Sequence, residues 1–227
     1  EVDKKQANDC YRQACEKGSS EAMLIYCRKL LKGDGISKNK EEAARIYTKF
    51  ADNGNTKAMN NYGLMLYYGN GIEMDKELAA EYLKKSADNG NPNAMFIYSK
   101  MLYEGDGIEM NKQLAANYFK SAADQGNSKA MLNYAEMCLN GDGIDVNKKE
   151  AIKYYEIFAS KGDSKASLNL GILLLTGNGI QKNKKKAAVY MKNAADLGDA
   201  DAMFNYGVMS FLGDGIKTDK KEGVKYI

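Results

Sequence analysis

The side chains that could carry chemistry in this chain are limited by one omission, because its 227 residues include no histidine. A Ser-His-Asp or Cys-His nucleophile pair, a histidine zinc site and imidazole acid–base catalysis are therefore excluded. Gly-Asp-Gly and Gly-Asn-Gly triplets resemble phosphate-binding loops, but no Gly-Lys-Ser/Thr follows any of them. Asp142 and Asp145 lack the ligand spacing of an EF-hand. The sequence predicts no catalytic residue, no cofactor and no metal ion.

The glycines of those triplets recur at a fixed interval and define a repeat. The triplets return every 36 residues over six copies without a slip, and a second series of single glycines keeps the same step. The triplet glycines are Gly33/Gly35, Gly69/Gly71, Gly105/Gly107, Gly141/Gly143, Gly177/Gly179 and Gly213/Gly215, and the single glycines are Gly18, Gly54, Gly90, Gly126, Gly162 and Gly198. An interval of this length indicates a tandem array of identical supersecondary units.

Each unit carries two helix-capping residues, which predict two helices. The first N-caps follow the single glycines, at Ser19, Asn55, Asn91, Asn127, Asp163 and Asp199. The second lie four places after each triplet, at Asn39, Asp75, Asn111, Asn147, Asn183 and Asp219. Helix A is predicted to run from the first cap to the triplet, and helix B from the second cap to the single glycine. Glu42, Glu150 and Glu222 lie where a capping box would place them.

The spacing of small and large side chains predicts the buried face of each helix. Helix A repeats an alanine, then a tyrosine or leucine four places later, as in Ala94 and Tyr98, and helix B carries two alanines with a tyrosine between them. These helix-B tyrosines are Tyr82, Tyr118, Tyr154, Tyr190 and Tyr226. We expect them to fill the gaps between units and to place their hydroxyls on polar partners. The predicted fold is an all-α superhelix, a solenoid of 36-residue helix-turn-helix units.

The unit of residues 91–126 resembles the Sel-1-like repeat, a 36-residue relative of the tetratricopeptide repeat. It has the alanine, tyrosine and Gly-x-Gly-Ile of helix A, and then the alanines and closing glycine of helix B. The chain departs from the pattern at Cys27, Ser99 and Ala135, where the family usually has a glycine. The resemblance covers essentially the whole chain and implies one repeat domain over 1–227. We expect this domain to be part of a longer protein, because neither end shows the polar cap that terminal repeats need. We expect a helix-B remnant at 1–17, then units 18–53, 54–89, 90–125, 126–161, 162–197 and a truncated 198–227.

The four cysteines, Cys10, Cys15, Cys27 and Cys138, are interpreted from their places in the repeat. Cys15 takes the position of a helix-B alanine and Cys27 that of the helix-A glycine, so both replace small packed residues. We expect free buried thiols, with a Cys15–Cys27 disulfide as the alternative. Cysteine-rich bacterial members of the resembling family place a bridge in each repeat, and this chain does not repeat that pattern.

Charge and hydropathy limit the kinds of partner. Thirty-three Lys and Arg against thirty Asp and Glu give a net charge of +3, which is too balanced to indicate a nucleic acid. No apolar run approaches the length of a membrane span. The absence of Asn-x-Ser/Thr sequons favours a cytoplasmic location. The alternative is the endoplasmic-reticulum lumen or secretion, if the full-length chain carries a signal peptide.

The surface most suited to a partner is a stripe along the A helices. It consists of helix-A positions on the side of each helix that does not belong to the predicted core. In stacked helical hairpins this side lines the concave wall. We call it the helix-A stripe. Its candidate binding residues are Asn60, Leu64, Tyr68, Phe96, Lys100, Glu104, Leu132, Glu136, Leu168, Ile172, Phe204, Val208 and Leu212. The C-terminal part is mostly apolar, which suggests a groove for a peptide or helix.

The resemblance implies a non-catalytic scaffold or adaptor that binds a protein partner and can assemble a larger complex. Sel-1-like proteins serve as adaptors in endoplasmic-reticulum-associated degradation, as activators of fungal chitin synthase and as bacterial host-interaction factors. No residue here chooses among these roles or names the partner. One alternative is a regulatory region attached to a kinase or other enzyme domain. Another is an RNA-binding helical repeat, which would need polar base-reading residues with basic flanks along the stripe.

Overall fold

All regular secondary structure within the described residues, 2–227, is α-helical, and side chains are described from residue 4 onward. The computed structural model divides into two compact units, residues 1–130 and 131–227. The first seven helices are α1 (Val2–Glu16), α2 (Ser20–Lys32), α3 (Lys40–Asp52), α4 (Thr56–Tyr68), α5 (Lys76–Asp88), α6 (Pro92–Glu104) and α7 (Lys112–Asp124). The others are α8 (Ser128–Asn140), α9 (Lys148–Ala159), α10 (Ser164–Thr176), α11 (Lys184–Asp196), α12 (Ala200–Leu212) and α13 (Lys220–Tyr226).

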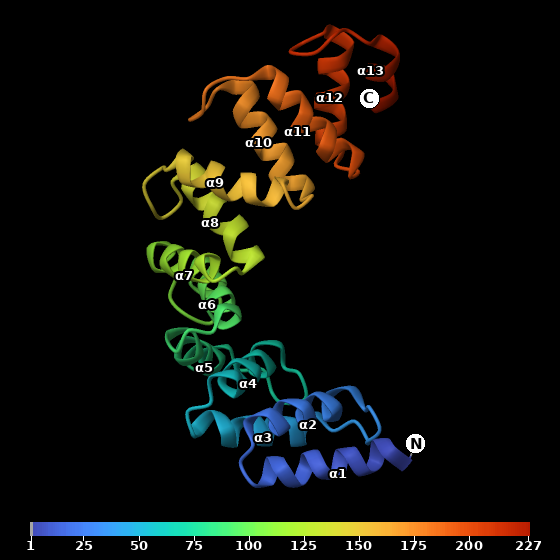
Figure 1. Ribbon diagram of the computed structural model, residues 1–227. Helices are drawn as coiled ribbons and strands as arrows, with labels where there is room; N and C mark the ends of the chain where they lie inside the picture. The colour runs from blue at the N-terminus through green and yellow to red at the C-terminus, as the bar shows by residue number, and fades with distance from the viewer. Residues whose placement is uncertain (1) are drawn as a thin grey trace. The chain divides into compact units, whose positions relative to one another are not determined.

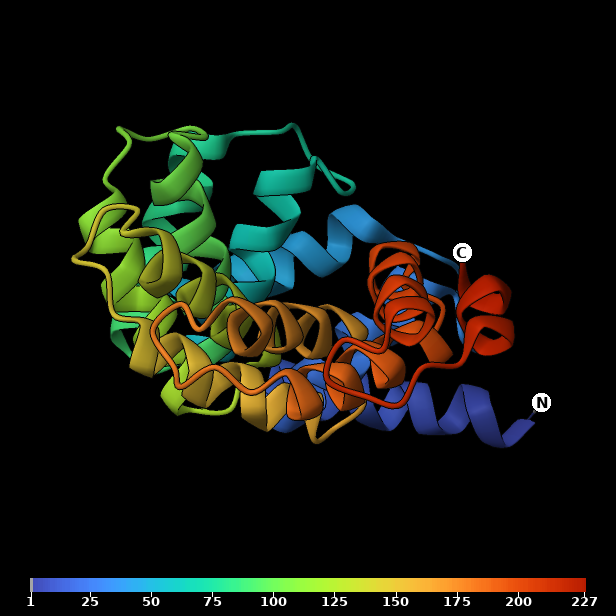
Figure 2. The same ribbon diagram turned by 90° about the horizontal axis from the view of Figure 1, so that it is seen from above.

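Consecutive helices pack against each other within each unit. In the first unit every helix from α1 to α7 contacts the next, and in the second unit the same holds from α9 to α13. Two viewpoints show the last pair, α12 and α13, side by side (Figures 1 and 2). The even-numbered helices are the predicted A helices and the odd-numbered ones the B helices. None of the helices within residues 2–227 combines the length and apolarity needed to cross a membrane.

Both predicted sets of caps begin helices in the structure. The Asn55 side chain accepts the backbone N–H of Ala58 at 2.9 Å, and the Asn39 side chain accepts that of Glu42 at 2.9 Å. Gly69 ends α4 in the left-handed region, at φ 61° and ψ 36°. Because caps and left-handed glycines satisfy helix-end backbone groups locally, they fix the helix bounds from sequence.

The prediction of a capping box is wrong for one of its two hydrogen bonds, the one from the backbone N–H of the cap to the glutamate side chain. A box needs the glutamate side chain to accept the backbone N–H of the cap. In the structure the Asn39 N–H donates instead to the Leu30 carbonyl at 2.9 Å, which ties the start of α3 to α2. Glu42 is left to pair with Arg45 at 2.7 Å. The cap N–H of Asn147 and that of Asp219 likewise donate to carbonyls of the preceding helix.

The second glycine of the triplet Gly105/Gly107 also allows two neighbouring repeats to approach closely. Gly107 has φ +78°, and a Cβ built there would lie 2.4 Å from the Lys76 Cβ. The Lys76 ammonium meanwhile reaches the Asp106 carboxylate at 2.5 Å. The triplet therefore ends helix A and also receives the first turn of the preceding B helix.

Three helix-B tyrosines, Tyr82, Tyr118 and Tyr226, reach the preceding repeat and donate their hydroxyls to its carboxylates, as predicted. Tyr82 Oη donates to Asp52 Oδ1 at 2.8 Å, and Tyr118 Oη donates to Asp88 Oδ1 at 2.5 Å. In each pair the tyrosine lies thirty residues beyond the aspartate. Tyr226 Oη donates to Asp196 Oδ1 in the same way, within residues 131–227.

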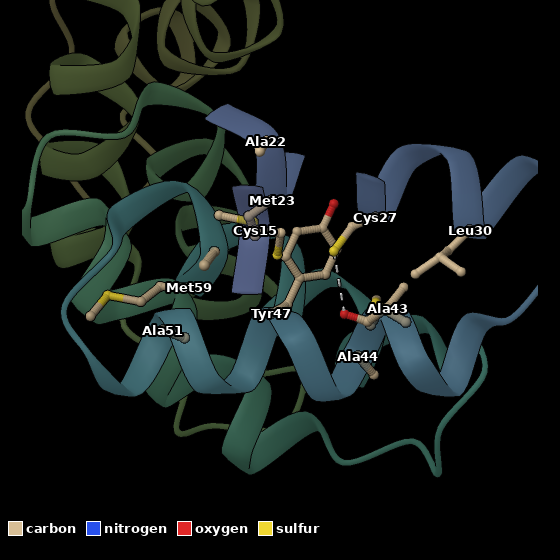
Figure 3. Close-up of a cluster of buried hydrophobic side chains, with 12 residues drawn as sticks. Cys15, Ala22, Met23, Cys27, Leu30, Ala43, Ala44, Tyr47, Ala51 and Met59 are labelled. Carbon is tan, nitrogen blue, oxygen red and sulfur yellow. Dashed lines mark hydrogen bonds between the residues drawn. The ribbon is translucent and has the colours of Figure 1, made fainter. Parts of the chain in front are cut away.

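Buried sulfur and aromatic groups form the core at the start of the chain. Figure 3 shows the Tyr47 ring next to Cys27, with Cys15 nearby, and the Cys27 Sγ donating to the Ala43 carbonyl at 3.8 Å. All four cysteines are free thiols, and Cys15, Cys27 and Cys138 are buried. Burial raises the pKa of both Cys15 and Cys27, which keeps these thiols protonated.

Acid is expected to weaken the contact between α5 and the loop after α6. Hydrogen bonds from Lys76 at 2.5 Å and Tyr67 at 2.7 Å hold the pKa of Asp106 below its usual value. A depressed carboxylate pKa stabilises the fold above the unfolded-state value and loses that contribution as pH falls through the folded-state value. We expect Asp106→Asn to reduce the acid-induced drop in the urea midpoint between pH 7 and pH 3, with an effect below about 1 kcal/mol because the pair is partly exposed.

The matched control is Glu109→Gln, which removes an exposed carboxylate from the same loop. Its pH profile should follow that of the unmodified chain. An Asp106→Asn profile that also overlays the unmodified one would contradict a stabilising role for the hydrogen-bonded carboxylate.

Candidate protein-binding surface

In the first unit, the helix-A stripe is mixed in burial and in polarity. Tyr68 is 64% exposed and its ring meets Tyr67 edge-on at 4.8 Å between centroids. Phe96 is half-buried, 6.0 Å from the Phe119 ring, and Leu64 is half-buried as well. Asn60 is buried, so its side chain serves the packing of the unit rather than its surface.

In the second unit, the stripe is more apolar and more exposed. Phe204 is 58% exposed, Leu212 is 67% exposed, and Val208 lies half-buried between them on α12. These three residues are four apart, so they share one face of the helix. Ile172 on α10 is 40% exposed, whereas Leu168, one turn earlier, is buried. Leu132 on α8 is half-buried.

The charged members of the stripe are already paired with neighbours. The Lys100 ammonium lies 3.5 Å from the Glu104 carboxylate, one turn further along α6. The Glu136 carboxylate lies 2.7 Å from the ammonium of Lys165. Because exposed ion pairs of this kind contribute little to stability, these charges remain available to orient a partner.

Exposed apolar residues outside the stripe were missed by the sequence reasoning. Met74 and Met110 stand 59% and 58% exposed in the loops after α4 and α6, and Phe211 on α12 is 37% exposed beside Leu212. An apolar residue at the same position of successive loops is a signal that could have pointed to Met74 and Met110. Phe211 carries no such signal, because only the packing of α12 exposes its ring.

The described part of the stripe contains no cluster of metal-ligating side chains. Among the described residues, no three or more Cys, Asp or Glu side chains gather as metal ligands would. The stripe offers apolar side chains flanked by paired charges, such as Phe204 and Leu212 on α12 and the Lys100–Glu104 pair on α6.

Comparison with known proteins identifies the family of the repeat. The Sel1 repeat model matches the chain from end to end, at residues 1–19, 20–55, 56–91, 92–127, 128–163, 164–199 and 200–227. No curated protein matches it.

Among the solved structures that match, two align over 98% of this chain. One is c5321, a protective antigen present in uropathogenic Escherichia coli strains and displaying an SLR fold. It aligns with a TM-score of 0.92 and 25% identity over 98% of this chain and 48% of its own, so the chain spans about half its length. The other is a Sel1 repeat protein from Oxalobacter formigenes, with a TM-score of 0.74 and 26% identity over 98% of this chain and 96% of its own. With helices, caps and glycines all at the family's interval, this chain belongs to the Sel1 repeat family, as an all-α solenoid of tandem helical repeats.

Proposed function

We propose that the chain is a non-catalytic scaffold that binds a segment of a partner protein along the helix-A stripe. Sel1 repeats generally mediate protein interactions and are typically non-catalytic. The observation that carries the proposal is the exposed apolar face of α12, where Phe204 and Leu212 stand in solvent with Val208 between them. Large exposed apolar side chains grouped on one face mark interaction sites in soluble proteins.

The spacing of that face suggests the form of the partner segment. Side chains at intervals of four residues present a continuous apolar ridge, which suits the apolar face of an amphipathic helix or an extended peptide. Ile172 adds an exposed apolar group on the preceding A helix. Assembly of the bound partner into a larger complex is part of the same proposal, and a regulatory region attached to a kinase or other enzyme domain is the alternative to it.

Phe204→Asp is expected to abolish partner capture without unfolding the chain. The ring is 58% exposed, so a charge there costs little in stability but disrupts an apolar contact surface. The measurement is a proximity-crosslinking capture compared between the unmodified chain and the variant, with thermal melting followed alongside. We expect at least a tenfold loss of captured partner and an unchanged melting curve.

Val189→Asp is the matched control, since Val189 is 55% exposed on the B helix α11. It should retain the partner that Phe204→Asp loses. Equal loss in both variants, or equal retention, would contradict the assignment of the stripe. A large drop in the melting temperature of Phe204→Asp would show that Phe204 is a packing residue.

A further inference from the structure

A cavity in the first unit lies where other repeats place a tyrosine ring. It has a volume of about 220 Å³ and is lined by residues of α1, α2 and α3, among them Glu16, Tyr26, Ile46 and Lys49. Ile46 stands at the helix-B position that holds Tyr82 one repeat later. Isoleucine has neither the aromatic ring nor the hydroxyl of tyrosine, so the space between these helices is left partly unfilled.

The partners of Tyr82 show what this space is built to hold. The Tyr82 ring meets Tyr62 edge-on at 4.9 Å, its hydroxyl donates to Asp52 at 2.8 Å, and the Lys85 ammonium lies 5.4 Å from its centroid. Exactly thirty-six residues earlier stand Tyr26, Glu16 and Lys49, and all three line the cavity. The cavity thus has the tyrosine, carboxylate and lysine that surround a phenol, without the phenol.

The same arrangement recurs further along the chain. Tyr118 meets Tyr98 at 5.0 Å and hydrogen-bonds Asp88, and Tyr226 meets Tyr206 at 5.0 Å. Tyr82, Tyr118 and Tyr226 therefore occupy the equivalent position of their own repeats in the same way. Edge-to-face aromatic pairs and hydrogen bonds to carboxylates both stabilise such a contact.

The cavity is not filled from within the first unit. Tyr47, the neighbour of Ile46, is 3% exposed and its ring lies in the core beside Cys27 (Figure 3). Glu16 keeps a side chain that is 63% exposed and is held only loosely by Arg12, at 3.5 Å. The carboxylate is thus able to accept a hydrogen bond from outside.

A second cavity, of about 420 Å³, shares Cys15, Glu16, Lys49 and Phe50 with the first and is also lined by the loop residues Gly18 and Asn55. Its rim of backbone and amide groups suits a peptide main chain, whereas the first cavity suits a ring. Together they match a tyrosine residue carried on a polypeptide.

We propose that this pair of cavities binds a tyrosine side chain of a partner protein, with its ring against Tyr26 and its hydroxyl donated to Glu16. The site is lined by the B helices α1 and α3 together with Tyr26 of α2, and its residues are not those of the helix-A stripe, so it goes beyond the function proposed above. The cavities between α1, α2 and α3 are then a second contact surface for a partner, one that recognises tyrosine.

The test uses N-acetyltyrosinamide as the probe, titrated into the full chain and followed by NMR or calorimetry. A small ligand of this size should bind with a Kd of about 1 mM. We expect N-acetylphenylalaninamide, which lacks the hydroxyl, to bind at least fivefold more weakly, and 4-methylphenol, which lacks the main chain, to bind more weakly as well. Equal binding of the phenylalanine probe would overturn the role of Glu16, and equal binding of 4-methylphenol would overturn a polypeptide as the source.

Two reciprocal variants are used, so that the test does not depend on one of them folding. Ile46→Tyr should fill the cavity with the chain's own phenol, raise the melting temperature and weaken probe binding at least tenfold. Tyr82→Ile should empty the next position and raise the stoichiometry from one probe to two. Unchanged binding in Ile46→Tyr overturns the proposal, and if that variant does not fold, an unchanged stoichiometry in Tyr82→Ile does so.

Discussion

Phe119→Ala will lower the free energy of unfolding by about 3–5 kcal/mol, as measured by urea denaturation of the full chain followed by circular dichroism. Phe119 on α7 is among the largest fully buried side chains, with 1% of its surface exposed. Its ring packs against Phe96 at 6.0 Å between centroids. Truncation to alanine removes the transfer free energy of the ring and leaves a cavity that the surrounding helices fill only in part.

Phe119→Leu is the matched control, because it keeps most of the buried volume and should cost only about 1 kcal/mol. A further comparison is Tyr118→Ala, next to it on the same helix but half-exposed. If Phe119→Ala cost no more than Phe119→Leu, the tight packing of this position would be refuted.

Ala79→Asp will have the second large effect, destabilising the chain by more than about 4 kcal/mol. Ala79 on α5 has no exposed surface, and α5 packs against α4. A Cβ built on Gly63 of α4 would lie 3.3 Å from the Ala79 carbonyl and 2.8 Å from the Leu83 Cγ. An aspartate there has no room and would bury an unpaired carboxylate, both of which are costly.

Glu81→Asp is the control, because it introduces the same side chain on the exposed face of the same helix. It should change the free energy of unfolding by less than about 0.5 kcal/mol. Thermal melting monitored at 222 nm distinguishes the two. An Ala79→Asp chain with an unchanged melting temperature would show that α4 and α5 are not in close contact.

The repeat and the helix bounds could be predicted from sequence because they depend on local interactions. Asn55 caps α4 by a hydrogen bond to an N–H three residues away, and Gly69 ends it with a left-handed backbone. Neither interaction requires a distant partner. That the helix-B tyrosines need polar partners could be predicted as well, since a tyrosine recurs at the same helix-B position from Tyr82 onward and a buried hydroxyl needs a hydrogen bond.

Burial along the helix-A stripe could not be predicted in the same way. Asn60 and Phe204 hold equivalent positions in their units, yet Asn60 is buried and Phe204 is 58% exposed. Sequence periodicity gives the same face for both. The difference arises from how closely the neighbouring helices approach each position, and that depends on side chains from other elements.

The sequence by itself determined that the chain is built from 36-residue helical repeats with two helices each. It also determined where those helices begin and end, and that tyrosines lie between neighbouring repeats. Only the tertiary structure decided that Glu42 does not close a capping box, since the cap N–H is taken by a carbonyl of the preceding helix. It also decided that Ile46 leaves a cavity, since a missing ring matters only where the neighbouring side chains do not move in to replace it. Local hydrogen bonds repeat with the sequence, whereas packing depends on the side chains that meet at each site.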